Sequence, residues 1–371
     1  MEIATPTLIV DKTIVERNTR AMRDKAIRTD VQFRPHVKTH KTIEIAHLQH
    51  GGAIGPITVS TLAEAEFFAD GGFTDITYAV PFAAGKLERA ASLARRVKTL
   101  NLLVDSGFTL TAIEEYAESN NVVFDLFLET DCGYHRSGVN PDAAESVDLA
   151  LRMGSSKHVR FRGLLTHGGH SYQATSRNEV AAVALEELAA VRRFNERLEG
   201  EGLRSLTRSV GSTPTCVVAP DFEGADEIRP GNYVFFDAFQ AAIGTCALRD
   251  CAATVLTSII GTYPEEGRLI IDAGALALSK DPGATHLNPA AGYGVVCNDQ
   301  LEPLPLTIYS LSQEHGQVRL TEPDMGGGKY QVGDRLRVVP NHSCLTAAMF
   351  DRYHVIEGGA IVDEWTPARG W

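Results

Sequence analysis

The chain has 371 residues, of which 44% are hydrophobic and 22% are charged, and its formal net charge is −12 at pH 7. This length and composition are typical of a globular protein with one large domain or two. The negative charge argues against nucleic acid or an anionic membrane as a general partner. No apolar run reaches transmembrane length, and no basic segment followed by an apolar one opens the chain, so we expect neither a membrane span nor a signal peptide.

The six cysteines are spread through the chain, at positions 132, 216, 246, 251, 297 and 344. A disulfide framework would show regular, close spacing in a short secreted chain. The scattered cysteines of this longer chain are typical of a reducing compartment. We therefore expect a cytoplasmic protein.

From residue 12 to about residue 245, apolar β-branched runs alternate with amphipathic helical patterns. A short β-like run at 7–10 comes first. The pattern then predicts eight strands, at 31–38, 56–60, 75–80, 99–105, 122–130, 159–166, 206–211 and 227–236. Helical patterns such as 83–97 and 178–198 lie between them. This alternation predicts an α/β fold with a (β/α)8 TIM barrel over residues 12–245.

From residue 246 the pattern changes to short strands joined by turns that contain Gly, Pro and Asp. No long helical pattern occurs in this part. The change predicts a separate C-terminal all-β domain over residues 246–371. The N-terminal segment 1–11 precedes the barrel, and its β-like run could join this β-domain.

The segment 33–41 carries basic residues at every second position: Arg34, His36, Lys38 and His40. On a strand these side chains would share one face. Such a face is difficult to bury without a ligand. A lysine among other cations has a depressed pKa and becomes an amine nucleophile, as a Schiff-base lysine must be. The alternative is a solvent-facing edge strand with a basic face.

Glycine and hydroxyl residues occur where the last two barrel strands end. Gly211, Ser212 and Thr213 follow the seventh strand, and Gly231 and Asn232 interrupt the eighth. Barrel active sites lie at such strand ends, and the last two loops are the usual phosphate site. Glycine lets backbone N–H groups approach phosphate oxygens, and hydroxyl groups add donors. The alternative is two ordinary turns.

A lysine and a phosphate site in one barrel mouth together predict pyridoxal 5'-phosphate. Arg136, after the fifth strand, would supply a cation near the cofactor's ring oxygen or the substrate carboxylate. His167, after the sixth strand, would lie against the ring, and Tyr172 of the same loop is a further cofactor-binding candidate. The alternatives are a structural salt bridge for Arg136 and a satisfied buried histidine for His167.

His342 and Cys344 follow a predicted strand at 335–339. On an extended segment, positions i and i+2 point to the same side. Imidazole and thiolate suit Zn²⁺, and two protein ligands leave positions for water or substrate, as in a catalytic site. The softness of the thiolate favours zinc over another divalent ion such as Mn²⁺. The alternative is that Cys344 is a small core residue.

Several segments together resemble the D-serine dehydratase and D-threonine aldolase family of fold-type III, alanine-racemase-like pyridoxal-phosphate enzymes. The resemblance runs nearly end to end. It implies a homodimer, with Lys38 as the Schiff-base lysine and His342 and Cys344 as the metal-ligand pair. It is carried by Arg-Pro-His-Val-Lys-Thr-His-Lys at 34–41, Val-Ser-Thr-Leu-Ala-Glu-Ala at 59–65, Gly-Ser-Thr-Pro-Thr at 211–215, Pro-Gly-Asn-Tyr at 230–233 and Pro-Asn-His-Ser-Cys at 340–344.

The resemblance implies chemistry on a D-3-hydroxy amino acid. Our catalytic candidates are Lys38, His167 and Arg136, the last two from their positions after the barrel strands. In this family the aldolases usually carry Asp at the second metal-ligand position and the zinc dehydratases carry Cys. Cys344 therefore favours a D-serine dehydratase, which forms pyruvate and ammonia. The alternatives are a D-threonine aldolase, which forms glycine and acetaldehyde, and a D-threo-3-hydroxyaspartate dehydratase. A non-catalytic cofactor-binding protein of the same fold would not need the His342 and Cys344 pair.

Overall fold

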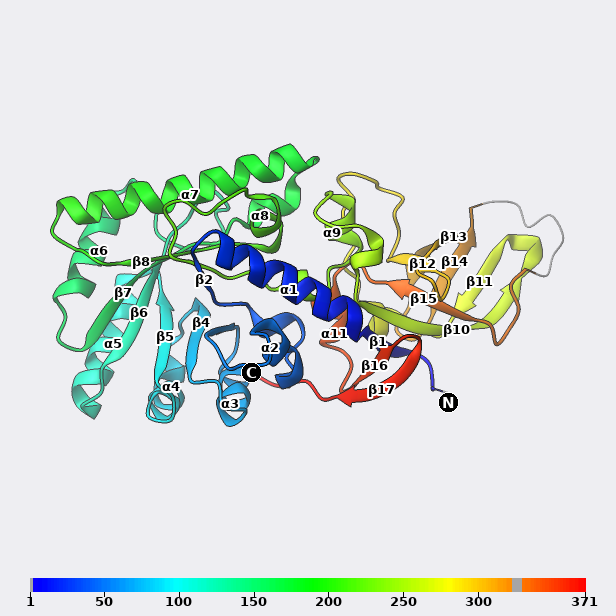
Figure 1. Cartoon of the computed structure of the whole chain (residues 1–371), viewed down its shortest axis with the longest axis horizontal. Coiled ribbons are helices and arrows are strands. Elements are labelled where there is room, and N and C mark those ends of the chain that lie inside the picture. Colours follow the sequence, from blue (N-terminus) through cyan, green and yellow to red (C-terminus); the bar gives the residue numbers. More distant parts are fainter. Residues whose placement is uncertain (1–2, 322–328) are drawn as a thin grey trace. The chain divides into compact units, whose positions relative to one another are not determined.

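The computed structural model describes residues 3–321 and 329–371 (Figure 1). Met1 and Glu2, which belong to the predicted N-terminal β segment, lie outside the described residues. The chain forms two compact units. The barrel unit comprises Arg20–Gly231 and Ala368–Trp371, and the β-unit comprises Met1–Thr19 and Asn232–Pro367.

In the described residues, the barrel unit contains one sheet of eight strands, all paired in parallel. Their spatial order is β2-β9-β8-β7-β6-β5-β4-β3. A parallel bridge between His36 and Thr58 joins the two ends of this order, which closes the sheet into a barrel. The predicted (β/α)8 barrel is confirmed. The strands are β2 (Gln32–Phe33), β3 (Ile57–Val59), β4 (Asp75–Pro81), β5 (Thr99–Val104), β6 (Phe124–Glu129), β7 (Val159–Leu165), β8 (Thr207–Val210) and β9 (Glu227–Ile228).

Helices alternate with these strands along the chain (Figure 1). Several begin at a hydroxyl residue whose side chain accepts a backbone N–H of the first turn, as Thr61, Ser106, Ser176 and Ser212 do. These caps fix where each loop after a strand ends. The helices are α1 (Lys12–Arg28), α2 (Ile43–Gln49), α3 (Leu62–Asp70), α4 (Leu87–Ala94), α5 (Gly107–Asn120), α6 (Ala144–Ser155), α7 (Arg177–Gly200) and α8 (Thr213–Val218).

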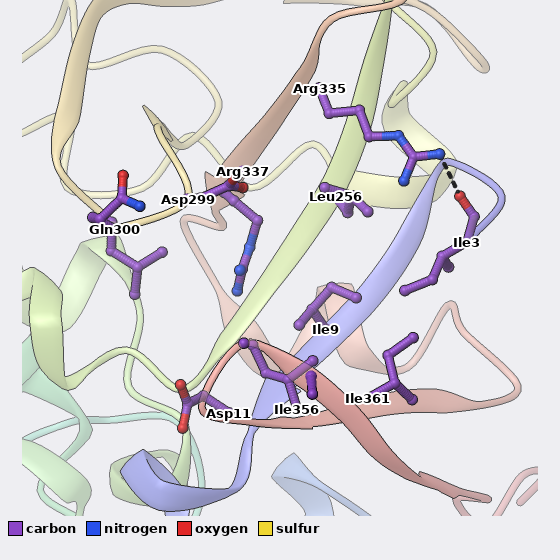
Figure 2. Close-up of a pocket in the computed structure, with 13 residues that line it drawn as sticks. Ile3, Ile9, Asp11, Leu256, Asp299, Gln300, Arg335, Arg337, Ile356 and Ile361 are labelled. Atoms are coloured by element: carbon purple, nitrogen blue, oxygen red, sulfur yellow. Dashed lines mark hydrogen bonds between the residues drawn. The ribbon is translucent and has the colours of Figure 1, made fainter. Parts of the chain in front are cut away.

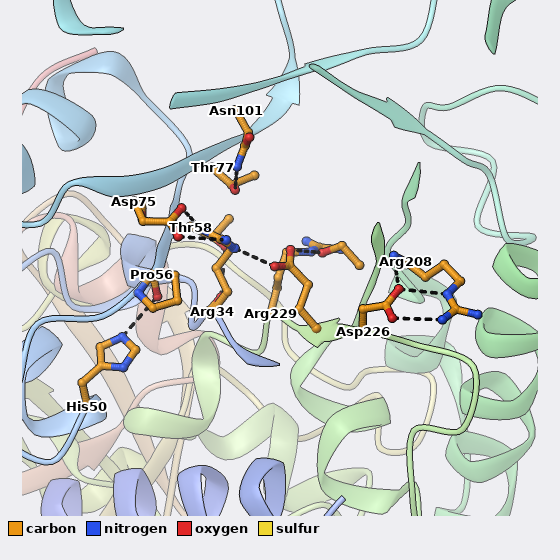
Figure 3. A network of polar contacts seen from close by, with 12 residues as sticks. Arg34, His50, Pro56, Thr58, Asp75, Thr77, Asn101, Arg208, Asp226 and Arg229 are labelled. Atoms are coloured by element: carbon orange, nitrogen blue, oxygen red, sulfur yellow. Dashed lines mark hydrogen bonds and ion pairs between the residues drawn. The ribbon is translucent and has the colours of Figure 1, made fainter. Parts of the chain in front are cut away.

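Charged side chains are paired in the interior of the barrel unit (Figure 3). Arg34 Nε donates to Glu227 at 2.8 Å, and its Nη1 donates to Asp75 at 2.6 Å. Ser209 Oγ donates to Glu227 at 2.6 Å and accepts from Arg229 Nε at 2.6 Å. These bonds offset the cost of removing buried charges from water.

The segment 31–38 is not the single strand that the sequence predicts. Strand β2 ends at Phe33, and Lys38 lies in a 3-10 turn over Val37–Thr39, capped by His36. Arg34 is turned toward Asp75 and Glu227, and His40 is fully buried. The four alternating basic side chains therefore do not share one face of a strand.

In the described residues, the β-unit contains a nine-stranded sheet in the order β11-β14-β13-β12-β15-β10-β1-β16-β17. Strand β10 also pairs with β11, so the strands from β11 to β10 in this order form a closed ring. The N-terminal strand β1 pairs antiparallel with β10 and parallel with β16. The strands are β1 (Thr7–Asp11), β10 (Ala253–Tyr263), β11 (Arg268–Ile271), β12 (Val295–Cys297), β13 (Pro303–Leu311), β14 (Gly316–Leu320), β15 (Arg335–Val339), β16 (Tyr353–Glu357) and β17 (Ala360–Trp365).

The chain passes from the barrel unit to the β-unit at residues 231–232, before the change of sequence pattern near residue 245. Backbone bonds explain this position, because Ala238 N–H donates to Pro340 at 3.0 Å and Ala252 N–H donates to Phe235 at 2.7 Å. Short helices α9 (Ala238–Ala242), α10 (Ala275–Leu278) and α11 (Ser343–Ala347) complete the β-unit. Across residues 3–321 and 329–371, no helix has the length and apolar character needed to cross a membrane.

Candidate active site

Lys38 lies at the end of the barrel where the strands lead into helices. Two histidines lie beside it: His36, which is buried, and His167, which is half-buried. The backbone N–H of Lys38 donates to His36 Nδ1 at 3.4 Å, and His36 Nε2 lies 3.4 Å from Ser60 Oγ, which follows β3. Burial, and then the charge of Lys38, lowers the pKa of His36 well below its usual value. The same two causes lower the pKa of His167. Both imidazoles are therefore neutral at pH 7.

His167 and Arg136 both contact the Tyr134 ring. His167 meets this ring edge-on, with ring centroids 6.1 Å apart, and the Arg136 guanidinium lies 5.5 Å from its centroid. His167 Nδ1 lies 3.2 Å from Gly211 O. Because a carbonyl oxygen only accepts, Nδ1 carries the proton and Nε2 is the acceptor. Arg136 is half exposed, and its nearest carboxylate oxygen, from Glu129, is 4.0 Å away.

The two loops predicted to hold a phosphate are in direct contact. Gly211 has φ +118°, and a Cβ there would lie 2.6 Å from Cys216 Sγ, so this turn requires glycine. Ser212 caps α8 through a reciprocal bond pair with Thr215. Thr213 Oγ1 accepts the backbone N–H of Gly231 at 3.3 Å. The structure thus brings the loop after β8 against the loop after β9.

Gly231 and Asn232 have different surroundings although they are neighbours in the sequence. A Cβ on Gly231 would lie 2.9 Å from His36 O, so glycine allows this loop to pack against the turn that contains Lys38. The Asn232 amide instead donates to Asp237 at 2.7 Å and to Ser343 at 2.9 Å, and its nitrogen lies 3.7 Å from Cys344 Sγ. The side chain of Asn232 therefore belongs to the cluster around Cys344.

Tyr172 lies in a 3-10 turn over Gly169–Gln173, after β7, and is half-buried. The neighbouring Ser171 is fully buried. Its Oγ donates to Gly168 O at 2.7 Å and lies 3.1 Å from Ser212 Oγ. This turn is therefore held against the cap of α8.

Glu187, a buried carboxylate on α7, was not among the sequence candidates. Its Oε1 accepts the backbone N–H groups of Gly168 at 2.7 Å and Gly211 at 2.9 Å. Its Oε2 accepts Thr215 Oγ1 at 3.0 Å. Bonds to a charged acceptor are stronger than neutral ones. One side chain therefore holds together the loops that follow β7 and β8.

His342 and Cys344 lie at the start of α11, not on the extended segment that the sequence predicts. His342 is the N-cap residue, and the helix begins at Ser343. The two side chains nevertheless contact each other, because the imidazole and the thiol share a hydrogen bond. A helix start therefore brings these side chains together.

A carboxylate stands behind His342. Asp281 Oδ2 lies 3.0 Å from His342 Nδ1. Burial opposes a charged imidazole, but Asp281 and Cys344 outweigh it and raise the pKa of His342 to about 11. A second carboxylate, Asp237, accepts the Ser343 N–H at 3.0 Å. Asp281 and Asp237 were not among the sequence candidates.

This donor set fits a borderline-soft divalent metal ion. With Nδ1 engaged by Asp281, Nε2 is the ring nitrogen left for a metal, and a carboxylate behind a metal-binding histidine is a common arrangement. Cys344 would add a sulfur ligand. Within the described part of the chain, no three or more His, Cys, Asp and Glu side chains are grouped so that they could hold a metal ion. A metal held by His342 and Cys344 alone would keep open positions for water or substrate.

Two family models match this chain. The model "Alanine racemase, N-terminal domain" covers residues 10–238, and "Putative serine dehydratase domain" covers residues 252–356. The D-serine dehydratase of Dictyostelium discoideum is 37% identical over 99% of this chain and 97% of its own length. This chain belongs to the D-serine dehydratase family of alanine-racemase-like enzymes.

The D-serine dehydratase family includes relatives with other names. The structure of D-threo-3-hydroxyaspartate dehydratase from Delftia sp. HT23 has a TM-score of 0.93 and 37% identity, and covers 100% of this chain and 98% of that one. The D-threonine aldolase of an Arthrobacter species is 30% identical over 100% of this chain and 93% of its own length. The family thus contains enzymes named for elimination and enzymes named for carbon–carbon cleavage.

Proposed function

We propose that this protein is a pyridoxal-phosphate- and zinc-dependent D-serine dehydratase, which converts D-serine into pyruvate and ammonia. The observation that carries the proposal is the His342 and Cys344 pair, backed by Asp281 at 3.0 Å. Elimination must expel the 3-hydroxyl group, which is a poor leaving group, and a Lewis-acidic metal ion stabilises the charge that develops there. The identity values agree, because the two dehydratases named above are 37% identical and the aldolase 30%.

The barrel unit would hold the cofactor. Lys38 would bind the aldehyde of pyridoxal phosphate, and the loops at 211–213 and 231 would bind its phosphate. When bound, the cofactor supplies an electron sink for negative charge at the substrate α-carbon. The contact between Gly231 N and Thr213 Oγ1 supports one shared phosphate site for the two loops.

The side chains around Lys38 suggest roles in moving and balancing protons. The Lys38 amine would remove the α-proton. His167 presents the acceptor Nε2, because its Nδ1–H is held by Gly211 O. Arg136 would pair with the substrate carboxylate, and Tyr172 would contact the cofactor.

In the β-unit, His342 Nε2 and Cys344 Sγ would hold the metal ion, and Asp281 would keep the imidazole in the tautomer that binds metal. Zinc is our first choice because thiolate is a soft ligand, and Mn²⁺ is the alternative. Asn232 Nδ2, 3.7 Å from the sulfur, would help to position it.

The test is a product assay on the purified protein with its cofactor and metal content recorded beforehand. D-Serine and D-threonine are supplied separately. Pyruvate or 2-oxobutyrate with ammonia supports the proposal. Glycine with an aldehyde would show an aldolase and overturn it.

The second candidate is dehydration of D-threo-3-hydroxyaspartate. It is supported by the Delftia dehydratase, which is 37% identical over 100% of this chain and 99% of its own length. This substrate carries an additional carboxylate, so its site needs another cation. A ratio of kcat/KM values that favours D-threo-3-hydroxyaspartate over D-serine would establish this alternative.

We also propose a homodimer, as the family resemblance implies. The chain mass is 40.2 kDa. Light scattering of the purified protein should give about twice this mass. A single-chain mass at the concentrations used for the assay would contradict the dimer.

A further inference from the structure

The β-unit has a groove whose residues are not among the candidates for the proposed reaction (Figure 2). Its volume is about 770 Å³, which is within the usual range for a small-molecule site. Strands β1, β10, β15, β16 and β17 all contribute to its walls. The apolar part of the lining is aliphatic, from Ile3, Ile9, Leu256, Leu301, Ile356 and Ile361.

The guanidinium of Arg337 is a buried cationic group in the wall of this groove. The Arg337 residue, on β15, is only 8% exposed. Its Nε and Nη2 both donate to one acceptor, Thr254 Oγ1, at 2.7 and 2.5 Å. In residues 3–321 and 329–371, no carboxylate forms an ion pair with it. A guanidinium has five N–H groups, so one hydroxyl oxygen leaves several of them for another acceptor.

Two carboxylates line the groove at a longer distance from Arg337. Burial lowers the pKa of Arg337, and the charges of Asp299 and Asp11 act against this shift. Asp11 also accepts the N–H of Ile14 at 3.1 Å, which fixes its side chain at the start of α1. Figure 2 shows Arg337 and Asp11 on one side of the groove, with Ile361 on the other. The groove therefore combines a cation, two anions and an aliphatic wall.

We propose that this groove binds a free α-amino acid with an aliphatic side chain. Arg337 would pair with the ligand's carboxylate, since bonds between two charged groups are the strong ones. Asp11 and Asp299 would attract its ammonium group, and the aliphatic wall would bury its side chain. The two carboxylates near the cation disfavour a simple anion and favour a zwitterion. The site is separate from the residues of the proposed reaction and does not depend on that reaction.

Isothermal titration of the full-length holoprotein tests the proposal with L-leucine as the probe. We expect saturable binding. Two analogues separate the charges: 4-methyl-2-oxopentanoate lacks the ammonium group, and 3-methylbutylamine lacks the carboxylate. We expect each to bind at least about tenfold more weakly, the effect of one lost charged hydrogen bond. No binding of L-leucine, or equal binding of all three compounds, overturns the proposal.

Two substitutions then locate the site. Arg337→Met keeps the length of the side chain and removes its donors, and it should weaken L-leucine binding at least about tenfold. Arg319→Met is the matched control, because Arg319 lies over the Tyr309 ring and does not line the groove. The Arg319→Met variant should bind L-leucine with the same affinity as the unmodified protein.

The second substitution, Ala360→Trp, fills the groove from an exposed position without altering Arg337. It should abolish binding, and it decides the question if Arg337→Met does not fold. Thermal unfolding of each variant shows whether it is folded. If folded Arg337→Met or folded Ala360→Trp binds L-leucine as tightly as the unmodified protein does, the assignment of the site is wrong.

Discussion

The histidines of the barrel unit and of the β-unit have opposite electrostatic surroundings. In the barrel unit, burial and the charge of Lys38 lower the pKa values of His36 and His167. In the β-unit, Asp281 and Cys344 raise the pKa of His342 to about 11 against the effect of partial burial. A histidine side chain is therefore neutral in the barrel unit and positively charged in the β-unit.

This difference shows what each environment can bind. A histidine beside a lysine adds no further positive charge and serves as a hydrogen-bond partner near a basic amine. A histidine between a carboxylate and a thiol attracts a cation, which is a proton in the metal-free protein and a metal ion when one is present. The difference supports the proposal that the barrel unit carries the covalent chemistry and the β-unit binds the metal.

The largest expected effect comes from replacing Lys38. Lys38→Ala should remove the visible absorbance of the lysine-bound cofactor and reduce kcat by about 10³-fold or more, because both attachment and proton transfer are lost. Lys98→Ala, at an exposed position of the same unit, is the control and should change neither. An unchanged spectrum for Lys38→Ala would contradict the role given to the barrel unit.

Asp281→Asn tests whether the carboxylate behind His342 supports metal binding in the β-unit. Loss of the carboxylate behind His342 should weaken zinc binding about 10- to 100-fold. Competition with a chelator of known zinc affinity measures the affinity of each variant for zinc. Glu314→Gln, at an exposed carboxylate of the same unit, should leave the affinity unchanged. Equal zinc affinity for Asp281→Asn and the unmodified protein would mean that the carboxylate does not support a metal ligand.

Glu187→Gln tests the carboxylate that joins the loops after β7 and β8. The amide keeps one acceptor and loses the charge, so the free energy of unfolding should fall by about 2 kcal/mol. Cofactor affinity should fall with it, because Gly211 and Thr215 are held by this side chain. Denaturant unfolding and cofactor titration measure the two effects. Glu186→Gln, one residue earlier and exposed, should affect neither.

The effect that is smallest at neutral pH, and grows only in acid, concerns His40, which lies in the barrel unit with His36. Burial lowers the pKa of His40 to about 3, below its value of about 6.5 in the unfolded chain. The unfolded state therefore takes up the proton first, so this contribution to stability is complete above pH 6.5 and is lost as the pH falls toward 3. The loss is about 1.4 kcal/mol per pH unit in that window.

Denaturant unfolding at a series of pH values measures the contribution of His40. His40→Gln should make the fall in stability below pH 6.5 shallower by about this amount. His315→Gln, at an exposed position, should leave the slope unchanged. An unaltered slope in His40→Gln would show that His40 is not held neutral in the folded protein.

The alternation of strands and helices was sufficient to predict the barrel, because each buried parallel strand is a short apolar run that a sequence shows directly. The segment 31–38 was predicted wrongly as one strand. Its polar residues suggested a basic face, but Arg34 is drawn inward by Asp75 and Glu227. Those partners lie 41 and 193 residues away in the sequence, and no local pattern indicates them.

The sequence candidates came from local motifs, and the residues that support them came from distant positions. Asp281 is 61 residues from His342, and Glu187 is 24 residues from Gly211. A lone carboxylate on a helix or in a loop has no spacing that distinguishes it from a solvated residue. Only the fold brings it to its partner. The cluster of Asn232 with Cys344 was missed for the same reason.

The proposed elimination requires a metal on His342 and Cys344. The most direct measurement is pyruvate formation from D-serine by protein that has been depleted of metal, retains its cofactor and is then titrated with zinc. We expect little pyruvate without zinc and a rise that saturates near one zinc per chain, with no such rise in Cys344→Ala. Full pyruvate formation by the metal-free protein would contradict it.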